Sequence, residues 1–173
     1  CSVYGGSKNQ DKYLSEESNL KPVSHYARMK AMAEQLILGI SNTLFAPTIL
    51  RFATVFGYSY RMRLDLVVNS FAKNAFFDKY IEVFGGNQWR PNVHVRDVAN
   101  AIIEVLKAPI DKVSRQVYNV GSNSENYTIN GLAELTMKVF KGIEIKQHDN
   151  LKDLRNYRVD FSKIEKVLGY RVR

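Results

Sequence analysis

The chain has 173 residues, 45% of them apolar and 24% charged, and this composition excludes a disordered protein. Its 25 basic and 17 acidic side chains give a formal net charge of +8, which favours an anionic partner: nucleic acid, an acidic membrane or a phosphorylated small molecule. The single cysteine, Cys1, excludes an intramolecular disulfide framework and a metal site built from cysteines alone, and it fits a reducing compartment such as the cytoplasm.

The first third of the chain predicts a strand, a loop, a helix and a second strand. Val3 and Tyr4 run into Gly5-Gly6 as the end of a strand enters a loop, and the polar loop continues over residues 7–24. Apolar residues at helical spacing predict a helix from His25 to about Ile40. The near-continuous apolar run 47–57, closed by a glycine, is typical of a strand buried on both faces in a parallel sheet.

The same alternation continues to the end of the chain. Thr128 and Asp160 are candidate N-caps of the last two helices, the second of which ends near Gly169. The predicted elements are a helix over 64–77, a strand over 80–84, a helix over 95–106, a strand over 116–121, a helix over 129–140, a strand over 143–145 and a short helix after 160. Strands that alternate with helices predict an α/β fold with a largely parallel sheet.

The sharpest chemical pattern is Tyr26 with Lys30. Their spacing of four residues places the phenol and the ammonium on one face of the predicted helix. A nearby positive charge favours the phenolate, so the pair can act as a general base near neutral pH if a cleft holds it against a substrate. On spacing alone, a surface tyrosine beside a solvated lysine is the more common interpretation.

A succession of further motifs surrounds this pair. They are Ser2-Val3-Tyr4-Gly5, the run 50–57 (LRFATVFG), the run 83–99 (VFGGNQWRPNVHVRDVA) and the run 116–121 (QVYNVG). In this order, and over nearly the whole chain, they resemble the extended short-chain dehydrogenase/reductase family, in particular its nucleotide-sugar epimerases and dehydratases. The resemblance implies the C-terminal part of a Rossmann-like parallel sheet with a smaller α/β substrate-binding lobe. It also implies NAD as cofactor, with NADP not excluded.

The resemblance assigns roles to the tyrosine and the lysine. Tyr26 would be the acid or base at the sugar hydroxyl that is oxidised to a ketone. Lys30 would bind the nicotinamide ribose and hold the pKa of the tyrosine down. The third catalytic residue of the family, a Ser or Thr, would stand immediately before Cys1. Family dehydratases carry an Asp-Glu pair where this chain has Cys1 and Ser2, so the resemblance favours an epimerase or a reductase variant.

The resemblance also implies substrate-binding residues. Arg90 stands before a proline, where a fork of donors can grip a pyrophosphate, and the family places an arginine there on the sugar-nucleotide diphosphate. Arg155 belongs to a stretch similar to the family's second phosphate-binding segment, with Arg158 in a looser register. Asn69 matches the substrate side of a family helix, and Thr54 stands where many members have Asn.

Other residues leave their roles open or are interpreted as structural. Arg61 and Arg63 either meet a phosphate or face solvent, and Trp89 either stacks on a nucleobase or packs over the preceding turn. His94 and Asp97 are interpreted as structural. The three histidines lack metal-ligand spacing with carboxylates, so no metal site is predicted.

The cofactor-binding signals of the family are missing from the sequence. No Gly-x-x-Gly-x-x-Gly loop occurs, nor does the acidic residue that follows such a loop by about 20 positions. We therefore expect residues 1–57 to be the C-terminal part of the Rossmann-like domain, 58–93 the substrate-binding lobe, 94–121 a return to the sheet and 122–173 the rest of the lobe. The N-terminal cofactor-binding half would lie outside these 173 residues, which are expected to be inactive alone.

The leading functional hypothesis is an NAD(P)-dependent nucleotide-sugar epimerase, with a reductase or a dehydratase of the same family as the alternative. An alternative of another class is a basic nucleic-acid-binding module, but the basic residues are scattered and no recognition motif is present, so nucleic acid is not the predicted partner. No apolar run reaches the about 20 residues of a membrane span, so no membrane partner is predicted either. The helix that carries Tyr26 and Lys30 resembles the one through which family members form homodimers.

Overall fold

The structure is a computed structural model that describes residues 1–5, 12–40, 42, 44–149 and 155–173. Its helices are η1 (Ser2–Tyr4), α1 (His25–Gly39), α2 (Val67–Phe77), α3 (Val95–Lys107), α4 (Ile110–Val113), η2 (Asn123–Glu125), α5 (Ile129–Val139) and α6 (Ser162–Leu168). Its strands are β1 (Tyr13–Leu14), β2 (Ile49–Phe52), β3 (Thr54–Phe56), β4 (Tyr80–Phe84), β5 (Trp89–His94), β6 (Val117–Val120), β7 (Asn126–Thr128), β8 (Glu144–His148) and β9 (Arg158–Val159). The predicted α/β class with parallel strands is confirmed.

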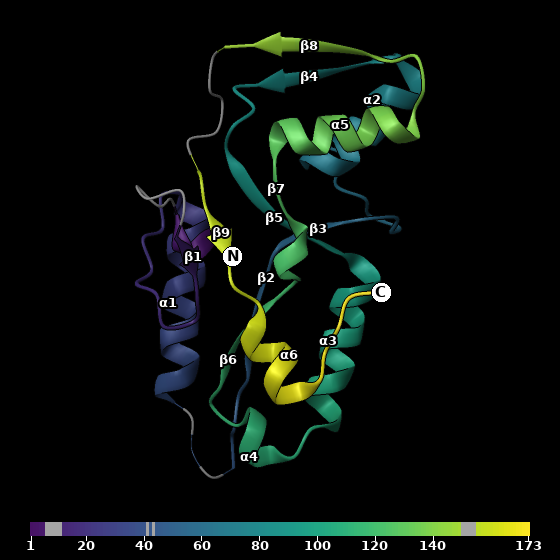
Figure 1. Ribbon diagram of the computed structural model, residues 1–173. Helices are drawn as coiled ribbons and strands as arrows, with labels where there is room; N and C mark the ends of the chain where they lie inside the picture. Colours follow the sequence, from purple (N-terminus) through teal and green to yellow (C-terminus); the bar gives the residue numbers. More distant parts are fainter. Residues whose placement is uncertain (6–11, 41, 43, 150–154) are drawn as a thin grey trace.

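One half of the molecule is built on the parallel pair β2–β6, whose register runs from Ile49 opposite Val117 to Phe52 opposite Val120. In Figure 1, α1 lies on one side of this pair, and α3, α4 and α6 lie on the other. The chain descends through α1 and returns upward through β2, so the start of α1 and the end of β2 lie at the same end of the molecule.

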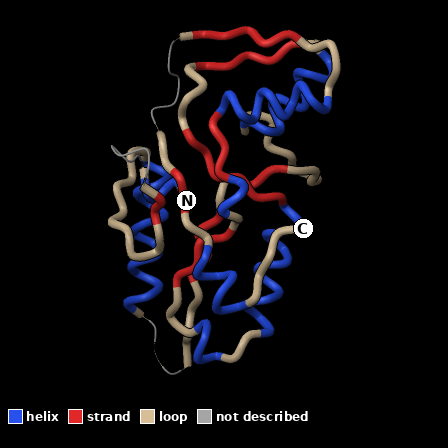
Figure 2. The backbone as a smooth tube through the Cα atoms, viewed as in Figure 1, coloured by secondary structure: helices blue, strands red, loops and turns tan. Residues whose placement is uncertain are grey.

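The predicted strand 47–57 is divided in two. It is interrupted at Ala53, where it changes partners: β2 pairs with β6, whereas β3 pairs in parallel with β5 and places Thr54 opposite Asn92. Ala53 itself stays attached to the first sheet, because its amide donates to the carbonyl oxygen of Val120 at 3.0 Å. The break carries the chain from one half of the molecule to the other (Figure 2).

The other half is a small lobe in which α2 and α5 pack on the parallel pair β4–β8 (Figure 1). Apolar side chains of α2, α5, β4 and the residue before β8 form its core. They are Phe71, Ala75, Ile81, Val83, Ile129, Leu132, Ala133 and Ile143. Two further cores lie in the first half, one around Tyr4, Val93 and Val159 and one around Tyr118, Val120 and Ile164. The exact domain boundaries given above stay a prediction.

Several predicted elements differ in detail. Val3 and Tyr4 were expected to end a strand, but they form the 3₁₀ turn η1, in which the amides of Tyr4 and Gly5 donate to the carbonyls of Cys1 and Ser2. Gly5 then takes φ = 72°, a conformation that glycine adopts without steric cost. The expected loop 7–24 contains the short strand β1, which pairs in parallel with β9.

The strand β5 was missed, because Pro91 lies at its centre and proline normally argues against an inner strand. Two helix starts also differ. The second helix begins at Val67 rather than Leu64, and the last begins at Ser162, with Phe161 at the N-cap position. Asp160 nevertheless contributes, because its carboxylate accepts from the Ser162 amide at 3.0 Å. None of the helices in the described ranges is both long and apolar enough to cross a membrane.

The predicted cap of α5 is confirmed, and it supports a test of stability. The hydroxyl of Thr128 accepts a hydrogen bond from the Gly131 amide at 3.0 Å. We expect Thr128→Ala to lower the free energy of unfolding by about 1 kcal/mol, because it leaves a helix-start amide without its acceptor. Urea denaturation of the variant measures this loss. Thr128→Ser keeps the acceptor and should stay near the original stability; an equal loss in both variants would contradict the capping role.

Candidate active site

A cleft of about 960 Å³ opens on the described part of the chain. One wall is the strand segment 48–57, and α1 supplies the facing wall. The rim is formed by residues 1–3, by the loop that follows β3 and by residues 155 and 157. Ligands of α/β proteins bind beyond the carboxyl ends of parallel strands, and this cleft extends past the ends of β2 and β3.

Tyr26 and Lys30 both line this cleft from the first turns of α1. The helix starts here because the hydroxyl of Ser24 accepts from the Ala27 amide at 3.2 Å and so caps the helix. Lys30 Nζ lies 5.7 Å from the centre of the Tyr26 ring, and Tyr26 is 64% exposed. The four-residue spacing therefore places a phenol and an ammonium side by side in an open cleft.

Thr54, Asn69 and Arg155 line the same cleft, so the structure brings together five of the six candidate residues. Asn69 is 9% exposed, and both atoms of its amide are engaged: Oδ1 accepts from the Gly57 amide at 3.1 Å, and Nδ2 donates to the Arg63 carbonyl at 2.9 Å. Asn69 thus holds the loop after β3.

Gly57 opens that loop in a conformation that only glycine accommodates well, with φ = 111°. A Cβ atom added to it would lie 2.5 Å from Nε2 of His94, far inside van der Waals contact. The His94 ring also packs edge-to-face on Phe56, with 5.3 Å between the ring centres. The glycine therefore lets the loop turn directly over the imidazole.

Arg90 is the sixth candidate, and it is not among the described residues that line the cleft. It is 7% exposed, its guanidinium donates to the carbonyls of Trp89 and Arg155, and it lies over the ring of Tyr157. Arg90 therefore supports the backbone of Arg155, and its contact with a diphosphate stays a prediction.

The two arginines whose role was left open, Arg61 and Arg63, both line the cleft. Arg63 binds the carboxylate of Asp65 through two hydrogen bonds of 2.7 and 2.6 Å. This contact lowers the pKa of Asp65 to about 2. Five basic residues line the cleft, against the two acidic residues Glu34 and Asp65, and this excess of positive charge suits an anionic ligand; the basic residues are Lys30, Arg51, Arg61, Arg63 and Arg155.

The remaining residues singled out from the sequence have packing contacts. The guanidinium of Arg158 lies 4.0 Å from the ring centre of Trp89 and covers that ring. His94 Nδ1 accepts from the Arg96 amide at the start of α3, and Asp97 accepts from the amide of Arg173. Within the described ranges no three His, Cys, Asp or Glu side chains lie close enough to hold a metal ion.

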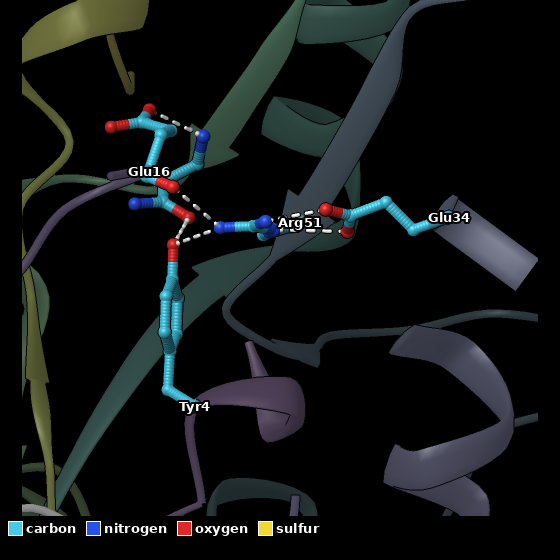
Figure 3. Close-up of polar contacts among 5 residues, drawn as sticks. Tyr4, Glu16, Glu34 and Arg51 are labelled. Carbon is cyan, nitrogen blue, oxygen red and sulfur yellow. Dashed lines mark hydrogen bonds and ion pairs between the residues drawn. The ribbon is translucent and has the colours of Figure 1, made fainter. Parts of the chain in front are cut away.

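A buried ion pair in the wall of this cleft was missed by the sequence reasoning. Arg51, at the centre of β2, binds both carboxylate oxygens of Glu34 on α1: Nε to Oε2 at 3.0 Å and a terminal nitrogen to Oε1 at 2.5 Å (Figure 3). The two side chains are 7% and 9% exposed. Glu34 is also part of the cleft wall.

Further hydrogen bonds hold the guanidinium from the other side (Figure 3). Its second terminal nitrogen donates to the Tyr4 hydroxyl at 2.7 Å and to the Glu16 carbonyl at 3.2 Å. The Tyr4 hydroxyl in turn donates to the side-chain oxygen of Asn119 on β6 at 2.7 Å. The backbone amide of Asn119 donates to the Glu16 carboxylate. One buried arginine therefore ties together η1, the segment before α1, α1 itself, β2 and β6.

Burial and these contacts shift the pKa values of the network. Burial lowers the pKa of Arg51, but its hydrogen bonds to Glu34 and Tyr4 outweigh that effect, so its net pKa is raised and it stays charged. Burial also raises the pKa of Tyr4, which stays a phenol and can donate to Asn119.

Two sequence signals could have revealed this pair. Arg51 interrupts the apolar run Ile49-Leu50-Arg51-Phe52-Ala53, and a charge in a buried strand requires a partner. Glu34 follows Tyr26 and Lys30 at the same four-residue interval, on the helix side that faces the sheet. Neither signal says which residue pairs with which, because the partners are 17 positions apart.

Comparison with known proteins agrees with the family resemblance of the sequence motifs over most of the chain. The family model described as "NAD dependent epimerase/dehydratase family" matches residues 1–121. Among solved structures, MoeE5 in complex with UDP-glucuronic acid and NAD is 28% identical with a TM-score of 0.81, and the match covers 99% of this chain and 57% of MoeE5.

Two further structures agree with this. UDP-glucuronic acid 4-epimerase from Bacillus cereus, in complex with UDP-glucuronic acid and NAD, is 25% identical with a TM-score of 0.82 over 99% of this chain and 54% of the epimerase. The dTDP-glucose 4,6-dehydratase DesIV from Streptomyces venezuelae, at 24% identity and a TM-score of 0.78, shares the fold over 99% of this chain and 52% of its own length. The chain spans about half the length of the solved structures that it matches.

The buried pair predicts a specific pattern of stabilities. Arg51→Met and Glu34→Leu should each lower the free energy of unfolding by about 3–5 kcal/mol, because each leaves the other charge buried without a partner. The double variant Glu34→Leu with Arg51→Met should recover most of that loss, since it removes both charges. Urea denaturation of the four proteins measures this coupling. Additive losses in the double variant would contradict a mutual pair.

The burial of Glu16 predicts that the stability of the protein depends on pH. Burial raises the pKa of its carboxyl group above the ordinary value of 4.5. The folded state therefore favours the protonated carboxyl group. The stability that goes with the protonated form is fully present below pH 4.5, and it is lost as the pH rises through the higher pKa of the folded protein. Gln keeps an oxygen that can accept from Asn119 but does not ionise. Relative to the original chain, Glu16→Gln should gain stability between pH 4 and pH 7 in denaturation curves; a flat difference would refute this.

Proposed function

This chain belongs to the NAD-dependent epimerase/dehydratase family, and from that premise we propose that it forms the catalytic-tyrosine and substrate-binding part of an NAD-dependent nucleotide-sugar epimerase. The observation that carries the proposal is the cleft. Tyr26 and Lys30 line it together with Thr54, Asn69 and Arg155, which come from three other segments of the chain. Family membership comes from the match between the sequence and the family model. The common cleft is a separate observation, because it rests on where the side chains lie in the structure.

The residues of the cleft suit the cofactor that this family uses. The Lys30 ammonium and the Tyr26 hydroxyl are donors that face an open space, as the two hydroxyls of a nicotinamide ribose require. When bound, NAD supplies the acceptor for a hydride from the sugar and later returns that hydride. The 173 residues have no glycine-rich phosphate loop, so what this chain offers is the ribose side of the site.

Proton transfer in the proposed reaction belongs to Tyr26. Its phenolate takes the proton of the sugar hydroxyl as that carbon becomes a ketone, and it returns the proton when the ketone is reduced from the opposite face. The Lys30 ammonium lies 5.7 Å from the centre of the Tyr26 ring. The neighbouring basic side chains favour an anionic substrate such as a nucleoside-diphosphate sugar.

The diphosphate is the proposed ligand of Arg155, with Arg90 holding the backbone of Arg155 behind it. Thr54 and Asn69 are proposed to face the sugar side of the cleft. UDP-glucuronic acid is the first sugar nucleotide to test, because MoeE5 and the Bacillus cereus epimerase are both known in complex with it.

Epimerisation is favoured over dehydration by Cys1 and Ser2. Both residues line the cleft, at the positions where the dehydratases of the family carry an acidic pair. Neither thiol nor hydroxyl replaces a carboxylic acid in removing water from the sugar. A reductase remains the alternative within the family.

A homodimer through α1 is part of the proposal. The outer side of this helix exposes large apolar side chains that a partner helix would cover: Met29, Met32, Leu36 and Ile40, which are 48–66% exposed. Contiguous apolar patches of this kind mark interaction surfaces. The lone cysteine supports a cytoplasmic location.

The proposed function is tested by Tyr26→Phe in the whole protein that carries these residues. The variant should lower kcat for UDP-sugar epimerisation by a factor of about 100 or more, with little change in KM, because it removes the proton-transfer group and leaves the ribose and diphosphate contacts. Tyr60→Phe is the matched control, since Tyr60 is fully exposed and is not part of the cleft wall.

Product analysis separates the alternatives. An epimerase leaves the mass of the sugar nucleotide and the amount of NAD unchanged, a dehydratase removes one water, and a reductase consumes NADH in proportion to product. Turnover of Tyr26→Phe at the original rate would refute the assignment of Tyr26. The absence of any conversion of UDP- and dTDP-sugars by the whole protein would refute the function.

A further inference from the structure

The helix that carries Tyr26 and Lys30 is held by few side chains. Of its fifteen residues, α1 buries Ala27, Ala31 and Glu34. Alanine methyl groups are small and make no directional bonds, so they allow a helix to slide or rotate by a fraction of a turn at little cost. The directional contact among these three is the bond between Glu34 and Arg51.

That bond is fixed at both ends. On the helix, Glu34 presents both carboxylate oxygens to one guanidinium, and a two-point contact sets direction as well as distance. On the sheet, Arg51 lies in β2 opposite Asn119 of β6, and its remaining nitrogen is held by the Tyr4 hydroxyl and the Glu16 carbonyl (Figure 3). The guanidinium therefore has no freedom to follow a moving helix.

Glu34 stands one helical turn beyond Lys30 and two beyond Tyr26. At about 1.5 Å per residue, the carboxylate lies about 12 Å along the axis from the Tyr26 position and about 6 Å from the Lys30 position. All three residues line the same cleft. A rigid helix transmits a rotation at Glu34 to both residues without loss.

We propose that Glu34 and Arg51 are positioning residues: their buried ion pair sets the rotation and axial position of α1 and thereby places Tyr26 and Lys30 in the cleft. The inference rests on the proposed function for its catalytic consequence. Its structural part, that the pair fixes α1, does not. Proton transfer needs the phenol oxygen within hydrogen-bond reach of the sugar, so a displacement of about 1 Å costs a factor of about 100 in rate.

The test compares stability with catalysis in the whole protein. The double variant Glu34→Leu with Arg51→Met keeps the buried volume filled but has no directional bond. Its melting temperature should approach that of the original protein, whereas its kcat should stay at least about tenfold lower and its KM for the sugar nucleotide nearly unchanged. Return of kcat together with stability would overturn the proposal, because the pair would then be structural only.

Two controls separate positioning from general loosening. Ile164→Ala creates a cavity in the core around α6 at a residue that does not line the cleft, and it should lower the melting temperature without changing kcat of the folded enzyme. Glu34→Gln is the mild variant: it retains one acceptor but not the charge, and it should reduce kcat even if the double variant fails to fold. An unchanged kcat in Glu34→Gln also counts against the proposal.

A readout without turnover keeps this inference distinct from the proposed function. Hydrogen–deuterium exchange of the 173-residue chain should be at least about tenfold faster over the amides of residues 28–39 in Glu34→Gln, while Ile164→Ala leaves that segment unchanged. Unaltered exchange in Glu34→Gln would overturn the claim that the pair fixes α1. If exchange accelerates but the whole protein converts no sugar nucleotide, the proposed function fails and the anchoring of α1 stands.

Discussion

The fold depends on how the charge of Arg51 is satisfied. A guanidinium at the centre of a strand costs a large desolvation free energy unless every side of it finds a partner. In this chain the partners of the guanidinium come from three separate segments, and each must be in place for the arginine to be buried. Electrostatics thus specifies the arrangement of η1, α1 and the β2–β6 pair around one side chain, where a purely apolar core would tolerate several packings.

The longer helices and several strands could be predicted from the sequence, but the pairing of the strands could not. Helix α1, β4 and the cap at Thr128 follow from local periodicity and local hydrogen bonding, which the sequence displays directly. The strand β5 was hidden because Pro91 breaks the expected pattern, and the division of the long strand at Ala53 depends on two partner strands that come later in the chain. These features arise from long-range contacts.

The residues of the site also differ in how far the sequence could predict their roles. Tyr26 and Lys30 are one helical turn apart, so it was predictable that they share one face of the helix. Their chemistry requires a cleft that holds them against a substrate, and both residues line one. Asn69 and Arg90 were assigned by motif, but their polar atoms make bonds within the protein, to Gly57 and Arg63 in one case and to backbone carbonyls in the other. A motif therefore indicates which residues lie near the site. Only the contacts of a side chain distinguish one that faces a ligand from one that supports a neighbouring residue.

The close approach of Gly57 to the His94 ring has an evolutionary consequence. A side chain at position 57 requires a smaller residue at position 94, and that smaller residue would give up both the acceptor at the start of α3 and the contact with Phe56. The backbone angle at position 57 strains any residue other than glycine whatever stands at position 94, so position 57 should remain glycine among homologues. The glycine thus lets the loop over the cleft lie directly against the histidine that caps α3.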